Sequence, residues 1–105
     1  MVIIQELSDQ IEEELEDACN YIDKALNTMG TDKATADLYA QLSAEEMGHV
    51  DKLHTRVVAV IEQYRKENGP PPAEMQWRYD YLHKKHIDKA MRIKVKQALY
   101  KEGAK

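Results

Sequence analysis

Residues 42–54 read LSAEEMGHVDKLH, and this stretch lies at the centre of the longest helix that the sequence predicts. Within it, Glu46 and His49 stand three residues apart, so on a helix they share one face about one turn apart. A carboxylate and an imidazole at this spacing can present two ligands to one metal ion. The pair is stronger evidence for a metal site if it faces a core than if it faces water. The flanking sequence indicates which face it occupies.

The stretch belongs to a predicted helix over residues 33–67. Apolar residues recur there in steps of three and four, at Leu38, Leu42, Leu53, Val57, Val60 and Tyr64. Glu46 and His49 fill the gap between Leu42 and Leu53 at the same periodicity, so we expect them to replace core residues. A parallel stripe contains Met47, Val50, His54, Val57 and Ile61. Because the apolar face is wide enough to touch two neighbours, the sequence predicts that this helix is central.

A first helix is predicted over residues 4–29. Its apolar stripe contains Leu7, Ile11, Leu15, Ala18, Ile22, Ala25 and Met29. Glu14 lies in or beside this stripe, and Tyr21 lies two turns further along it. A carboxylate on a core face must be paired, protonated or bound to a cation. Glu14 is therefore a candidate ligand, whereas Glu45, on the flank of the second helix, is expected to be solvated.

A third helix is predicted over residues 72–101. Gly30 can end the first helix and Thr31 or Asp32 can cap the second, so the first two helices should form an antiparallel hairpin. The run Asn68-Gly69-Pro70-Pro71-Pro72 ends the second helix, and Pro72 can begin the third. The third helix also offers Asp80, His83 and His86 at helical spacing, so it could supply further ligands or only polar contacts.

The composition indicates one small all-α domain over residues 1–105. The chain is 43% hydrophobic, and three long helices in so short a chain make a thin bundle with apolar surface left over. We therefore expect a homo-oligomer, most simply a dimer. The net charge of −4 argues against nucleic acid and against an anionic membrane, and no apolar run is long enough to cross one. A single cysteine excludes an intramolecular disulfide and is compatible with the cytoplasm.

The chain resembles the ferritin-like superfamily, including rubrerythrin and the small helical-hairpin ferritins that form their site between subunits. The resemblance covers about residues 7–57 and is carried by Glu14-x6-Tyr21 and Glu46-x-x-His49. It implies that Glu14 and His49 each bind one metal ion, that Glu46 bridges both, and that Tyr21 lies close to the centre. The implied metal is iron, with manganese or zinc as alternatives.

The sequence departs from that family in having three predicted helices where a full ferritin-like chain has four. A second subunit could supply the other half of a di-iron carboxylate centre, Asp80, His83 and His86 could replace it, or the centre has been lost. Two functions follow. One is a metal-binding protein with ferroxidase or peroxide chemistry at a subunit interface. The alternative is a metal-free helical interaction or scaffold protein, for example one encoded by a phage or prophage, in which a polar core pair sets the helix register.

Overall fold

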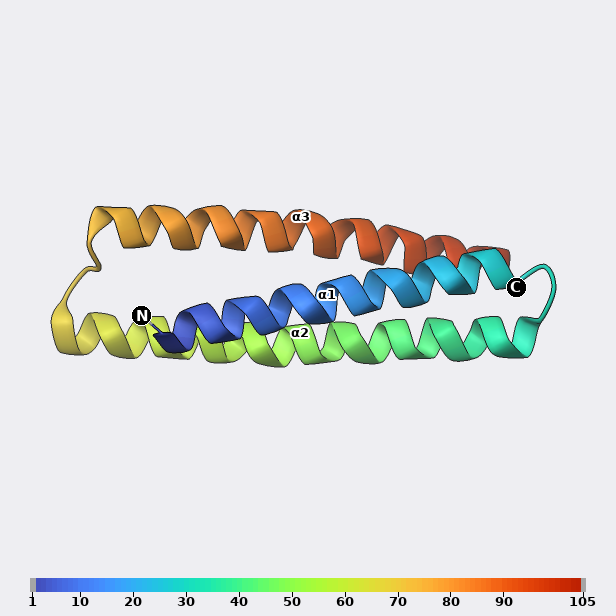
Figure 1. The fold of residues 1–105 in the computed structure, drawn as a ribbon, viewed down its shortest axis with the longest axis horizontal. Coiled ribbons are helices and arrows are strands. Elements are labelled where there is room, and N and C mark those ends of the chain that lie inside the picture. Colours follow the sequence, from blue (N-terminus) through green and yellow to red (C-terminus); the bar gives the residue numbers. More distant parts are fainter. Residues whose placement is uncertain (1, 105) are drawn as a thin grey trace.

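The computed structural model describes residues 2–104 and folds them into three α-helices (Figure 1). Helix α1 spans Val2–Thr28, α2 spans Lys33–Asn68 and α3 spans Ala73–Gly103. The helices lie side by side in a rod of 55 × 18 × 17 Å. The predicted all-α class and the three long helices are confirmed. Of the predicted domain 1–105, Met1 and Lys105 lie outside the described residues.

The connection between α1 and α2 is a tight turn that makes these helices an antiparallel hairpin. Asp32, one of the two predicted caps, is the N-cap of α2. Its carboxylate accepts the backbone N–H of Thr35 at 3.1 Å and the Thr35 hydroxyl at 2.8 Å. These hydrogen bonds to the charged form lower the pKa of Asp32, as an N-cap carboxylate should show.

The connection between α2 and α3 contains Gly69 followed by three prolines, which restrict its backbone. Gly69 adopts a positive φ of 77°, and its backbone N–H donates to the carbonyl of Arg65 at 2.9 Å. This conformation suits glycine because a Cβ would be strained there. Pro72, predicted to be the first residue of the third helix, is instead its N-cap, and α3 begins one residue later, at Ala73.

Helix α1, and not α2 as predicted, is the central helix. Figure 1 shows α1 crossing diagonally from α2 toward the C-terminal end of α3, and the backbone of α1 comes close to both helices, whereas α2 and α3 are joined mainly by side-chain contacts. Its predicted stripe is confirmed at Ile11, Leu15, Ala18, Ile22 and Ala25, which are all buried. Two alanines in that stripe allow the neighbouring helices to approach α1 closely.

Helix α2 uses a different face for the core than the one we expected. Leu38, which starts the predicted main stripe, is 52% exposed. The buried residues of α2 are Ala36, Ser43, Met47, Val50 and Val57, so the second predicted stripe is the one that faces α1. The rotation is possible because small residues, alanine and serine, occupy the N-terminal half of this face.

Polar contacts attach the C-terminal half of α3 to the hairpin. The buried Ser43 hydroxyl donates to the carbonyl of Ala18 at 2.7 Å and accepts the Gln97 side-chain amide at 3.0 Å, so it links all three helices. The Tyr100 hydroxyl donates to Asp37 at 2.5 Å, and this bond raises the pKa of Tyr100 to about 12. None of the helices within residues 2–104 combines the length and apolar character needed to cross a membrane.

Candidate metal centre

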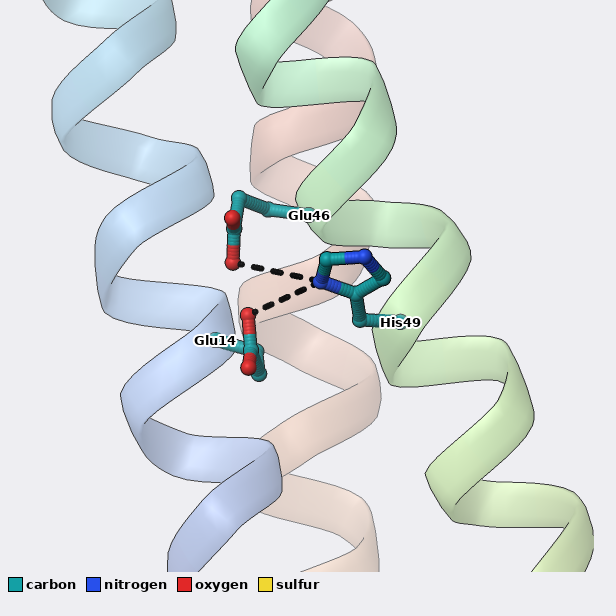
Figure 2. Close-up of side chains that lie close together, drawn as sticks. All are labelled: Glu14, Glu46 and His49. Carbon is teal, nitrogen blue, oxygen red and sulfur yellow. Dashed lines mark hydrogen bonds and ion pairs between the residues drawn. The ribbon is translucent and has the colours of Figure 1, made fainter.

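The structure brings Glu14, Glu46 and His49 together at one point of the α1–α2 hairpin. Figure 2 shows Glu14 reaching from α1 toward the two side chains of α2. One ligand atom from each residue lies within 4.8 Å of the other two. His49 Nδ1 is 3.4 Å from Glu14 Oε2 and 3.7 Å from Glu46 Oε2. These are the three side chains that the sequence selected as its main candidate ligands.

The position of the group follows from the packing of the two helices. Glu46 and His49 immediately precede the buried residues Met47 and Val50, and Glu14 likewise precedes the buried Leu15. One residue is a rotation of about 100° on a helix, so all three side chains lie at the edge of the α1–α2 contact. The expectation that Glu46 and His49 replace core residues is therefore wrong, because α2 turns its other stripe to the core.

The three side chains of this group differ in their exposure to solvent. The side chains of Glu14 and Glu46 are 16% and 19% exposed, while that of His49 is 52% exposed. In Figure 2, α3 runs behind the hairpin, so the group opens on the side away from α3. Two shielded carboxylates with an imidazole at the rim form a shallow site that a second molecule could cover.

Glu46 has the least satisfied side chain of the group. Its Oε2 atom is buried and has no hydrogen-bond partner, and the 3.7 Å separation from His49 Nδ1 is too long for a hydrogen bond. An unpaired buried acceptor costs about 1–3 kcal/mol. Within residues 2–104, neither Glu14 nor Glu46 forms an ion pair with a lysine or arginine. The site therefore lacks a compensating cation from the described part of the chain, and a metal ion fits this need.

Gln10 orients Glu14. Its side-chain amide donates to Glu14 Oε1 at 3.0 Å, one turn earlier on α1. The other oxygen, Oε2, is the one that faces His49. Outer hydrogen bonds of this kind fix the direction of a ligand carboxylate. Sequence reasoning missed Gln10, although its spacing of four residues from Glu14 is a usable signal.

The other candidates on α3 lie apart from this group. Asp80 accepts a hydrogen bond from Gln76 at 2.9 Å and is exposed. The His83 ring stacks on His54 with 4.9 Å between centroids, and His86 Nε2 lies 3.6 Å from Glu12 Oε2. These residues face different neighbours because α3 packs on the other side of the hairpin.

The histidines between α2 and α3 form a partly buried stack. The Tyr79 ring also stacks on His83, with 5.6 Å between centroids. Burial lowers the pKa of both His83 and His86, and the neighbouring His54 lowers that of His83 further. Neutral imidazole rings are therefore favoured here, as expected for packing groups at a helix contact.

Tyr21 lies outside the three-residue group. Its ring stacks on Tyr39 of α2 with 6.3 Å between centroids, and Lys24 Nζ lies 5.5 Å from the centroid of the Tyr39 ring. Tyr21 follows Glu14 by seven residues, a rise of roughly 10 Å along α1. Its contacts in the single chain are thus those of an aromatic pair that packs α1 on α2.

A groove with an apolar lining lies at a different place in the molecule. It has a volume of about 360 Å³ and lies between the N-terminal end of α1, the C-terminal end of α2 and the start of α3. Its apolar lining includes Ile4, Ile61, Tyr64 and Met75. None of the three candidate ligands lines it, so the group of Glu14, Glu46 and His49 lies outside this groove.

Comparisons with known proteins add no relative to this description. No family model matches the chain, and neither curated proteins nor solved structures give a significant match.

Proposed function

We propose that this protein is a ferritin-like metal-binding protein that holds iron at Glu14, Glu46 and His49. The observation that carries the proposal is the buried, unpartnered Oε2 of Glu46, which lies 3.7 Å from His49 Nδ1, the nitrogen that is also 3.4 Å from Glu14 Oε2. Two carboxylates and one imidazole suit iron, and manganese and zinc accept the same donors. Iron is preferred because the resemblance at these residues is to iron proteins.

We further propose that two subunits complete the centre. One chain offers three ligand side chains, whereas a di-metal carboxylate centre draws on four helices. Because the group opens away from α3, a two-fold axis can bring two such groups face to face. Glu14, Glu46 and His49 would then be supplied twice, and Glu46 would occupy the bridging position that the resemblance implies.

The chain's own residues supply position and charge to this centre. Gln10 would hold Glu14 in its ligating direction, and His49 would present Nδ1, the ring nitrogen that already points at both carboxylates. Bound iron supplies one-electron chemistry toward oxygen or peroxide, so the proposed activity is that of a ferroxidase. A partner subunit that covers the exposed His49 would exclude water from the same site.

Anaerobic equilibrium dialysis with ferrous iron tests this function. Wild-type protein should retain stoichiometric iron, and Glu46→Gln, which keeps the shape of the side chain and removes its charge, should bind at least about tenfold more weakly. The matched control is Glu45→Gln, at the exposed neighbouring position, where the carboxylate contacts only Gln41. Glu45→Gln should bind iron as wild type does.

A metal-free interaction protein is the alternative outcome. The 3.4 Å contact between His49 and Glu14 favours it, because this contact joins α1 and α2 without any ion. If the wild-type protein retains no iron, manganese or zinc, the proposed function is overturned and the metal-free alternative is supported.

A further inference from the structure

Helix α3 carries a second apolar stripe on the side opposite its core face. The buried residues Ile93 and Tyr100 face the hairpin. The outward stripe contains large apolar side chains that are between 44% and 69% exposed, namely Trp77, Tyr81, Ile87, Met91, Val95 and Leu99. A helix that is apolar on two faces buries only one of them in a three-helix chain. Within residues 2–104 the outward stripe has nothing packed on it.

The spacing of this stripe is that of a coiled-coil seam. Steps of four and three residues connect Trp77, Tyr81, Lys84, Asp88, Met91 and Val95. The seam is apolar at both ends, and its two central positions hold opposite charges. A polar layer within an apolar seam is a device that sets register and partner in paired helices.

We propose that this outer face of α3 binds the same face of a second copy of the chain, with the two α3 helices antiparallel. The seam positions are symmetric about position 86, since 84 and 88, 81 and 91, and 77 and 95 lie equally far from it. In that register Lys84 faces Asp88 of the partner subunit. Tyr81 then faces Met91 of the partner subunit, and Trp77 faces Val95 of the partner subunit.

Charge complementarity indicates that the partner bound by the outer face of α3 is a second copy of the chain. Lys84 and Asp88 are exposed, and within residues 2–104 neither has an ion-pair partner. A two-fold axis at position 86 pairs each of them with its opposite, twice, at the centre of the seam. An anionic membrane surface would leave Asp88 opposed by charges of its own sign.

The rest of the face is compatible with this pairing. Trp77 and Tyr81 stack on each other, with 6.0 Å between ring centroids, so the aromatic end of the seam presents one continuous apolar surface. On one flank, Asp80 would approach Lys94 of the partner subunit. The other flank is basic, but Lys85 lies 3.9 Å from Glu12 of its own chain, which offsets part of that charge.

This contact is independent of the proposed metal centre. The group of Glu14, Glu46 and His49 opens away from α3, whereas the seam lies on the outer surface of α3. The pairing of α3 helices needs no metal, and the metal-binding residues take no part in it. A chain with both contacts would assemble beyond a dimer when metal is present.

Sedimentation equilibrium of the full chain in the presence of a chelator tests the contact. Metal-free wild type should be a dimer at micromolar concentration, and Met91→Glu should weaken it roughly tenfold or more. The matched control is Leu38→Glu, since Leu38 is also a large exposed apolar residue but lies on α2. Circular dichroism should show equal helix content in all three proteins, because both substituted positions face solvent.

Two further measurements test the orientation and the occupant. In a Cys19→Ser background, Tyr81→Cys protein and Met91→Cys protein should form a mixed disulfide under mild oxidation, while neither should cross-link with itself. Self-cross-linking of either variant would indicate parallel helices and overturn the proposal. A metal-free wild type that is monomeric, or one that instead sediments with phosphatidylglycerol vesicles, would also overturn it.

Discussion

His49 Nδ1 on α2 lies 3.4 Å from Glu14 Oε2 on α1, and this contact joins the two helices at the edge of their shared core. The nearby Oε2 of Glu46 is buried and lacks a hydrogen-bond partner. The carboxylate of Glu14 is thus in contact with the imidazole, while that of Glu46 keeps one buried oxygen without a hydrogen-bond partner. A site that binds metal is expected to show this imbalance in its metal-free form.

Replacing Glu46 should therefore stabilise the metal-free protein. We expect Glu46→Leu to raise the free energy of unfolding in urea by about 1–2 kcal/mol in the presence of a chelator, because it removes an unpaired buried acceptor. Glu45→Leu, at the exposed neighbouring position, should change it little. A loss of stability in Glu46→Leu would show that the carboxylate is already satisfied without metal.

Metal binding should stabilise the wild type, by an amount that rises with the logarithm of the free metal concentration over the dissociation constant. Free metal at a hundred times the dissociation constant should raise the free energy of unfolding by about 2.7 kcal/mol. Thermal unfolding should show this increase for wild type and for Glu13→Gln, an exposed neighbour of Glu14. Glu14→Gln and His49→Ala should lose most of it. An equal metal effect in all four proteins would place the binding site elsewhere.

Stability should fall in mild acid because of two partly buried histidines of α3, His83 and His86. Burial holds the pKa of His83 and His86 below 6.5, so the unfolded chain binds more protons than the folded one as the pH drops below about 6.5. This contribution is complete above that pH and is lost as the pH falls. His83→Phe, which keeps the ring stack on His54, should flatten the decline in the urea midpoint between about pH 7 and 5.5. An unchanged decline would mean that His83 makes no contribution to it.

Ser43 should matter more for stability than its size suggests. Ser43→Ala removes the bond to the Ala18 carbonyl and leaves the Gln97 amide without its acceptor, so we expect a loss of about 1–2 kcal/mol in urea unfolding. The matched control is Thr55→Ala on the same helix, where an exposed hydroxyl bonds only the carbonyl of Asp51. Equal losses in both variants would contradict the linking role of Ser43.

Periodicity was sufficient to predict the helices and the core face of α1, because its apolar stripe is unbroken and flanked by acids. It failed on α2, where two stripes compete. Leu38 begins one stripe and is exposed, whereas Met47 and Val50 of the parallel stripe are buried, and small residues such as Ala36 and Ser43 decide which face approaches α1. Close packing of small residues depends on the partner helix, so one helix's sequence does not reveal it.

The sequence was sufficient to predict which residues form the candidate site, but not how exposed they are. Spacing placed Glu14, Glu46 and His49 on facing stripes, and the structure brings them together. The exposure of His49 could not be predicted, because it follows from the rotation of α2. The separation of His83 and His86 from the group follows from the side on which α3 packs, which no motif in the sequence records.

Anomalous scattering from a crystal of the iron-loaded protein tests the central proposal most directly. It should show iron bounded by Glu14, Glu46 and His49 and by the same three residues of a second subunit, and Glu46→Gln crystals prepared in the same way should lack that signal. Iron bound at His83 and His86, or none at all in fully loaded wild-type crystals, would contradict the account.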